Sequence, residues 1–209
     1  MIFPMHWVFA GIIGLGLSSA FAQSQALRDF RVKSSSEKIP GQTGRLILSE
    51  AHFERSPEAI WSLLNRFEEF PSYLPRVTAC ESLGTLGEKE QVYVSINLPW
   101  PLPNLWNILA IQRQPAVHRF DWEMVRGNMN VLEGTLAIEA EGKGSLVKLR
   151  VRTDPGKFIP KWLVSWGAKH YVPKLLLAVN ERLKQPKDLP APVAPASVIP
   201  KQIPAVGAQ

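Results

Sequence analysis

Hydrophobic and polar residues alternate along most of the middle of the chain, between about residues 77 and 152. A period of two is typical of strands that have one covered face and one face in water. The positions that share one face in successive predicted strands are Val77, Ala79, Glu81 and Leu83; Val92, Val94, Ile96 and Leu98; His118, Phe120, Trp122 and Met124; Leu132, Gly134, Leu136 and Ile138; and Val147, Leu149 and Val151. Another strand, 106–114, is apolar on both faces. We therefore expect six consecutive strands of one antiparallel sheet.

Two short helices and a first strand are predicted ahead of this sheet. Leu46, Leu48 and Phe53 lie in the first strand, and Ser56 with Pro57 has the composition of a helix start. The apolar stripe of that helix consists of Ala59, Ile60, Leu63, Leu64 and Phe67. The proline-rich segment 70–75 predicts a second, shorter helical turn.

A long amphipathic helix is predicted after the last strand. The tripeptide 154–156 (Asp-Pro-Gly) forms a turn, and Pro160 falls in the first helical turn, where its missing N–H costs nothing. Trp162 and Trp166 are four residues apart and so share one helix face. Such a helix needs a wide apolar surface to cover, which the sheet supplies. The expected fold class is α+β, a curved antiparallel sheet wrapped around a long C-terminal helix, with an apolar interior between them.

Two stretches of the sequence are distinctive: residues 98–102 (Leu-Pro-Trp-Pro-Leu) and 154–164 (Asp-Pro-Gly-Lys-Phe-Ile-Pro-Lys-Trp-Leu-Val). They resemble the START-like superfamily, which includes START lipid-transfer domains, polyketide cyclases and coenzyme Q-binding proteins, and the resemblance covers about 45–184. It implies a helix-grip fold that binds a hydrophobic molecule between the sheet and the C-terminal helix. START domains commonly continue the first stretch with a polar Ser-Asp-Arg-Asp-like segment, whereas this chain has Pro-Asn-Leu-Trp at 103–106. That departure favours a more apolar ligand, or a different binding pose, over recognition of a polar head group.

The predicted ligand-binding residues are mainly large apolar side chains, because each methylene removed from water contributes about 0.8 kcal/mol. The wall candidates are Trp106, Phe120, Trp122, Met124, Leu132, Leu136, Trp162 and Trp166. The alternative for each is ordinary core packing. The polar candidates are Arg113, His118 and His170. Arg113 is suited to holding a phosphate or carboxylate, or else to pairing with a strand neighbour such as Glu123.

Signals for catalysis are weak in this sequence. Outside the first 22 residues, histidines occur at only three scattered positions, 52, 118 and 170, and no HExxH, CxxC, glycine-rich phosphate loop or Gly-x-Ser-x-Gly motif is present. We expect a protein that carries its ligand without chemistry and uses no cofactor or metal. The alternative is a cyclase-like or hydrolase-like enzyme on the same fold, with His118 and a neighbouring carboxylate, Asp121 or Glu123, as acid and base.

The net charge of +6 and the sequence pI of 9.6 indicate affinity for anionic surfaces. Lys157, Lys161 and Lys169 flank the two helix tryptophans, and basic with aromatic residues suits docking on an anionic bilayer. No nucleic-acid-binding motif is found, so nucleic acid is not an expected partner. We expect a monomer that makes transient contact with an anionic membrane.

The two ends of the chain differ in composition from its middle. Residues 1–22 have an apolar run ending in Ala-Phe-Ala, which predicts a signal peptide and export to a bacterial periplasm; the alternative is an uncleaved membrane anchor. Residues 23–44 are polar and predict a linker or arm, and 185–209 predict a disordered tail rich in proline and alanine. An envelope adaptor that uses this tail is a third functional alternative. The single cysteine, Cys80, excludes an intramolecular disulfide and is expected in the core.

Overall fold

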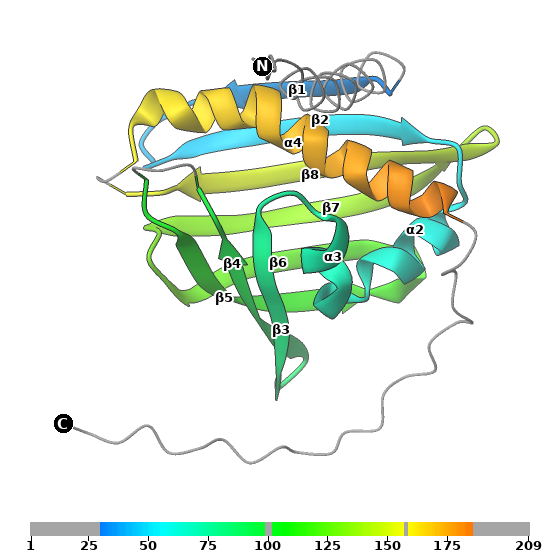
Figure 1. Cartoon of the computed structure of the whole chain (residues 1–209), viewed down its shortest axis with the longest axis horizontal. Coiled ribbons are helices and arrows are strands. Elements are labelled where there is room, and N and C mark those ends of the chain that lie inside the picture. Colours follow the sequence, from blue (N-terminus) through cyan, green and yellow to red (C-terminus); the bar gives the residue numbers. More distant parts are fainter. Residues whose placement is uncertain (1–29, 99–101, 157–158, 186–209) are drawn as a thin grey trace, which may run out of the picture.

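The computed structural model describes residues 30–98, 102–156 and 159–185. Within them, eight antiparallel strands form one sheet in the order β1-β2-β8-β7-β6-β5-β4-β3 (Figure 1). The strands are β1 (Val32–Glu37), β2 (Arg45–Phe53), β3 (Val77–Leu86), β4 (Lys89–Ile96), β5 (Leu105–Gln114), β6 (Arg119–Gly127), β7 (Val131–Glu141) and β8 (Gly144–Asp154). The helices are α2 (Pro57–Leu64), η1 (Phe67–Glu69), α3 (Phe70–Tyr73), η2 (Pro115–Val117) and α4 (Lys161–Lys184).

The predicted element order is confirmed, from the first strand (β2) through two short helices and six strands to the long helix α4. Strand β1 is an addition, because it lies in the segment 23–44 that we expected to be a linker or arm. It pairs with β2 at one edge of the sheet, with Ser34 opposite Ser49. The predicted signal peptide, 1–22, and all of the predicted tail except Gln185 lie outside the described residues.

Strand register determines which side chains face the helices. Ile47, Ala51 and Phe53 of β2 are buried, and their partners on β8 include Val151 and Val147. Continuing across the sheet, the covered face carries Leu132, Gly134, Leu136 and Ile138 of β7, Phe120, Trp122 and Met124 of β6, Asn107, Leu109, Ile111 and Arg113 of β5, and Glu90, Val92 and Val94 of β4. The other face carries charged ladders, such as the ion pair between Arg152 and Glu133 at 2.6 Å. The period-two pattern therefore separates a covered apolar face from a charged outer face.

Helix α2 begins where the sequence predicts. Ser56 is its N-cap and accepts a hydrogen bond from the backbone N–H of Ala59 at 3.4 Å, and Pro57 is the first helical residue. Ile60, Leu63 and Leu64 are the buried residues of the helix. They place α2 against one end of the covered sheet face, where η1 and α3 follow (Figure 1).

Helix α4 crosses the covered face diagonally from the edge formed by β1 and β2 to α2 (Figure 1). The hydroxyl of Ser34 donates a hydrogen bond to the carbonyl oxygen of Ala168 at 2.7 Å and so attaches the helix to β1. Pro173 lies inside the helix and has no N–H to donate to the carbonyl of Lys169 one turn earlier. Among the described helices, none is long and apolar enough to cross a membrane.

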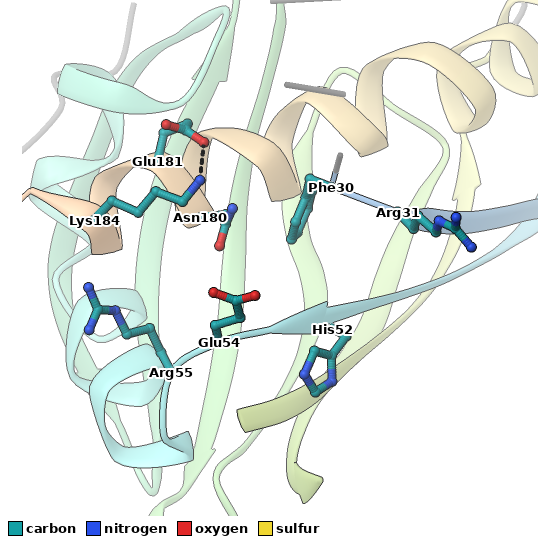
Figure 2. A pocket seen from close by; sticks show the side chains of 8 residues that line it. All are labelled: Phe30, Arg31, His52, Glu54, Arg55, Asn180, Glu181 and Lys184. Atoms are coloured by element: carbon teal, nitrogen blue, oxygen red, sulfur yellow. Dashed lines mark hydrogen bonds and ion pairs between the residues drawn. The ribbon is translucent and has the colours of Figure 1, made fainter. Parts of the chain in front are cut away.

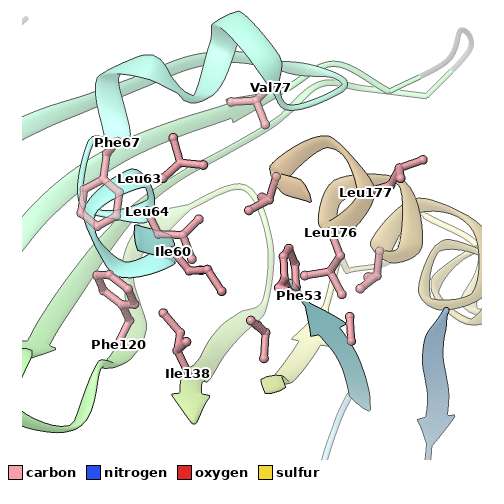
Figure 3. Packing of buried hydrophobic residues seen from close by; sticks show 14 of the residues in the cluster. Phe53, Ile60, Leu63, Leu64, Phe67, Val77, Phe120, Ile138, Leu176 and Leu177 are labelled. Carbon is pink, nitrogen blue, oxygen red and sulfur yellow. The ribbon is translucent and has the colours of Figure 1, made fainter. Parts of the chain in front are cut away.

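The core lies where α2, η1 and the second half of α4 meet the sheet. Phe53, Ile60, Phe120 and Ile138 are buried, and Leu176 of α4 lies beside Phe53 (Figure 3). Cys80 is also buried there, as predicted. Burial raises the pKa of its thiol to about 12, so the thiol stays neutral and acts as a small apolar core group.

Candidate functional site

The apolar side chains in the middle of the covered face are only partly buried, although α4 and the short helices lie over that face. They are Trp122, Met124, Leu132, Leu136, Leu149 and Val151, and Val164 of α4 packs against the same cluster. Each of these side chains therefore keeps some contact with solvent. We call this set the half-buried apolar surface. An apolar surface of this kind, held between sheet and helix, can bind a hydrophobic molecule because displacing water from it is favourable.

Trp122 of β6 pairs with Gly134 of β7, which has no side chain to keep the indole away from the strand. A Cβ atom at Gly134 would lie 2.5 Å from Cζ2 of the Trp122 indole and 2.5 Å from the carbonyl oxygen of Arg150. Only glycine therefore lets the indole lie flat on β7. This fixes the orientation of the largest side chain in the half-buried apolar surface.

Of the predicted wall residues, Phe120 belongs to the closed core. Its ring stacks on Trp61 of α2 at a centroid distance of 4.2 Å and contacts Phe67 at 6.1 Å. Trp122, Met124, Leu132 and Leu136 remain as the predicted residues that the structure brings together on the accessible part of the covered face.

Trp106 does not join this group. It pairs with Ser95 and alternates along β5 with Asn107, which is 1% exposed on the covered face. Trp106 is therefore on the outer face of the sheet. Its place in a strand that is apolar on both faces gave no signal for which face would be covered.

The tryptophans of α4 also lie elsewhere than predicted. Trp162 is 68% exposed and Trp166 is 48% exposed. The ring of His170 stacks on Trp166 at 5.0 Å, and its Nδ1 lies 2.9 Å from the carbonyl oxygen of Trp166. The residues that α4 does bury include Ala168, Val172, Leu176 and Leu183. The i, i+4 spacing predicted a shared face for the two indoles correctly, but this part of the face is not packed on the sheet.

Arg113 faces the covered side of β5, and its partner is Glu90, not Glu123. Nη2 of Arg113 lies 2.5 Å from Oε2 of Glu90, which is 13% exposed. The same guanidinium lies over the Phe67 ring at 4.7 Å and donates to the carbonyl oxygen of Asn65 at 3.4 Å. Glu123 is on the outer face and pairs with Lys89 at 2.5 Å. Arg113 thus holds the turn after α2 against the sheet.

His118 lies in the turn before β6, with a left-handed backbone (φ 45°), not in the strand. Its ring contacts Trp61 edge-on at 5.7 Å. Its expected acid–base partners are engaged elsewhere. Asp121 accepts hydrogen bonds from Arg119, which hold the pKa of that carboxyl below its ordinary value, and Glu123 pairs with Lys89. The structure does not assemble the predicted acid–base pair.

The three lysines predicted to dock on a membrane are described only in part. Lys157 and the side chain of Lys161 lie outside the described residues. Lys169 is exposed on α4, beside His170, and Lys174 is exposed one turn later.

The turn between β6 and β7, at residues 128–130, is held by hydrogen bonds to two other segments. The Asn128 amide donates to the carbonyl oxygen of Asn104 at 2.7 Å and accepts from the N–H of Trp106 at 3.0 Å. The N–H of Asn130 donates to the carbonyl oxygen of Asp154 at 2.8 Å. Turn 128–130 therefore joins the segment before β5 to the end of β8.

A separate polar pocket of about 710 Å³ lies at the other end of α4. Its lining residues are Phe30, Arg31, His52, Glu54, Arg55, Asn180, Glu181 and Lys184 (Figure 2). Glu181 and Lys184 form an ion pair across 2.9 Å, and the Phe30 ring meets Phe53 edge-on at 5.1 Å. Its mixed charges do not fit the apolar ligand that the covered face suits. Elsewhere in the described part of the chain, no three His, Cys, Asp or Glu side chains are grouped so as to hold a metal ion.

Comparison with known families gives one clear match. A family model described as "Polyketide cyclase / dehydrase and lipid transport" matches residues 47–185, which span β2 to the end of α4. No curated protein sequence matches the chain significantly.

Solved structures share this fold. A STAR-related lipid transfer protein from Xanthomonas axonopodis has a TM-score of 0.64 at 19% identity, over 74% of this chain and 94% of that chain. Human STARD10 has a TM-score of 0.60 at 16% identity, over 86% and 82% of the two chains. The Zhui aromatase/cyclase from Streptomyces sp. R1128 has a TM-score of 0.55 at 12% identity, over 66% and 92%. The predicted START-like helix-grip fold is confirmed, and the fold alone does not separate carriers from enzymes.

Proposed function

The chain belongs to the polyketide cyclase/dehydrase and lipid transport family, and on that premise we propose that it binds a lipid or another hydrophobic small molecule and carries it in the cell envelope. The ligand would lie on the half-buried apolar surface beneath α4. The observation that carries this proposal is the accessibility of Trp122, Met124, Leu132 and Leu136 on a face that a helix covers. The location in the envelope is supported by the predicted signal peptide at 1–22.

The chemistry of the surface favours an apolar ligand without a strongly bound head group. The charged residues on the covered face, Arg113 and Glu90, form an ion pair at 2.5 Å beside Phe67, at the closed end of the core. Displacing Glu90 by a ligand phosphate would leave its carboxylate, which is 13% exposed, without its cation, which is costly. The half-buried apolar surface itself offers aliphatic and aromatic contacts, so we expect long acyl or isoprenoid chains to bind.

The first experiment is native mass spectrometry of the full protein purified from its own envelope, followed by organic extraction and identification of the bound molecule. A stoichiometric lipid or quinone would support the proposal and name the ligand class. A protein that arrives empty and also fails to take up fluorescent lipids or quinones would contradict it.

Two neighbouring residues of β6 offer a matched pair of variants. Met124→Trp adds bulk to the half-buried apolar surface, whereas Val125→Trp adds the same indole at a position exposed to solvent. Because each excluded methylene is worth about 0.8 kcal/mol, we expect Met124→Trp to weaken lipid uptake about tenfold and Val125→Trp to leave it unchanged. Thermal unfolding of both variants controls for loss of folding. Equal uptake by the two variants would place the ligand somewhere else.

A further inference from the structure

We infer that the first half of α4, residues 161–172, is a docking surface for the interface of an anionic phospholipid bilayer. Trp162 and Trp166 are the two large apolar side chains of α4 that are exposed to solvent, by 68% and 48%. They lie one helical turn apart, and His170 extends the same ridge by stacking on Trp166. We call Trp162, Trp166 and His170 the aromatic ridge.

The aromatic ridge is the uncovered continuation of a face that the same helix buries further along. Eighteen residues make five turns of an α-helix, so Trp162 and Asn180 have the same angular position. Asn180 is 8% exposed, and Leu177 nearby on that face is buried. Asn180 lines the polar pocket with Phe30 and Glu54, at the end of β2 (Figure 2). This face is therefore covered in the second half of α4, and in the first half the two indoles meet solvent.

Charge identifies the surface that fits this ridge. Between Asp154 and Glu181 the sequence holds four lysines and no acidic residue. Of the four, Lys169 and Lys174 are exposed on α4 within the described residues. A run of cations around two exposed indoles complements a negatively charged apolar interface. Indole rings prefer the level of lipid head groups, and each lysine near an anionic leaflet adds further attraction.

The place of the ridge on the molecule agrees with a bilayer as its partner. Val164 of α4 packs inward against the core cluster, within the same helix turns that present Trp162 and Trp166 outward. The half-buried apolar surface and the ridge are therefore on two sides of one helix segment. The use of this contact for loading and unloading ligand rests on the proposed function, but the contact itself does not.

Vesicle flotation of the full protein tests the docking directly. With phosphatidylcholine vesicles containing about a third phosphatidylglycerol, we expect binding that weakens as salt rises, since exposed charges are screened. The variant Trp162→Ala with Trp166→Ala should lower the partition coefficient at least about tenfold, because both apolar anchors are lost. The matched control is Leu83→Ala with Leu86→Ala, which removes two exposed apolar residues, 50% and 71% exposed, from the hairpin of β3 and β4. Equal loss in both variants would overturn the inference.

A second pair of variants tests the charge. Lys169→Glu with Lys174→Glu should lower binding to the anionic vesicles at least about tenfold at low salt. The control, Lys38→Glu with Lys143→Glu, makes the same change in net charge at exposed positions outside α4. If the control loses as much binding, the attraction is a property of the whole molecule and the assigned surface is wrong.

Lipid uptake in the absence of vesicles separates this inference from the proposed function. The double tryptophan variant should take up a fluorescent lipid from cyclodextrin as well as the natural protein does. If it instead loses uptake and floats normally with vesicles, the indoles belong to the ligand site, as the sequence first indicated, and docking by the ridge is overturned. A natural protein that takes up lipid but does not float with anionic vesicles would overturn the docking and leave the proposed function standing.

Discussion

The two halves of α4 differ on one side of the helix, which is exposed at Trp162 and Trp166 in the first half and buried at Leu177 in the second. Residues 173–184 lie between the sheet and the short helices, with Leu176, Leu177 and Leu183 buried. Residues 161–172 are held on the sheet through Ala168 and Val172, and their opposite side is the aromatic ridge. The sequence of α4 is apolar in both halves. What differs is the neighbouring chain, so burial along this helix is decided by elements that lie a hundred residues earlier.

The largest effect should come from a core residue of the second half. Leu176→Ala creates a cavity beside Phe53, and we expect it to lower the free energy of unfolding by about 2–5 kcal/mol. Trp162→Ala, in the first half, should change that free energy by less than about 0.5 kcal/mol because the indole is already in solvent. Urea titration of the two variants measures both values. Similar losses would mean that the first half is as tightly packed as the second.

A smaller loss of stability is expected at Arg113, which holds the turn after α2 against the sheet. Arg113→Ala leaves the carboxylate of Glu90 at low exposure without its cation and frees the Asn65 carbonyl, so we expect a loss of about 2 kcal/mol. The matched control is Lys89→Ala, which breaks the outer-face pair with Glu123 and should cost less than about 1 kcal/mol. Thermal unfolding compares them. A control that costs as much as Arg113→Ala would remove the distinction between the two faces.

The smallest loss of stability should follow from weakening the attachment of residues 161–172 of α4 to β1. Ser34→Ala removes the hydrogen bond to Ala168 and leaves the buried Ser49 hydroxyl without the partner that lies 2.8 Å away, at a cost of about 1 kcal/mol. We expect amide hydrogens of 161–172 to exchange faster, while those of 173–184 change little. Ser35→Ala, on the exposed side of the same strand, is the control. Uniform acceleration along the whole helix would show that its two halves open together.

Most of the fold follows from local patterns in the sequence. Period-two alternation predicted β3, β4 and β6 to β8, an apolar run predicted β5, and Ser56 with Pro57 predicted the start of α2. Strand β1 has no such signal, because its inward residues include Ser34 and Ser36, whose small polar side chains read as a linker. That strand is stabilised by pairing with β2 and by the contact with α4, and neither is a local property.

Residues of the candidate site could be predicted only where the sequence showed which face of a strand is covered. Trp122, Met124, Leu132 and Leu136 follow from alternation, but Trp106 does not, because its strand is apolar on both faces. The partner of Arg113 depends on register: Glu90 lies opposite Ile111, one step along the same face, whereas Glu123 lies opposite Ala110 on the other. The exposure of Trp162 and Trp166 depends on which side of α4 packs on the sheet, which helical spacing does not encode.

Pro173 lies where the two halves of α4 join, and it interrupts the ladder of backbone hydrogen bonds at one rung. Helices normally fray or open cooperatively because each rung supports the next. Because this backbone hydrogen bond is absent, residues 161–172 can separate from β1 as a unit while the helical turns that pack on the core stay folded. Local opening of residues 161–172 and global unfolding would then have separate barriers, so substitutions in this segment would change the rate of opening at little cost to the lifetime of the folded protein.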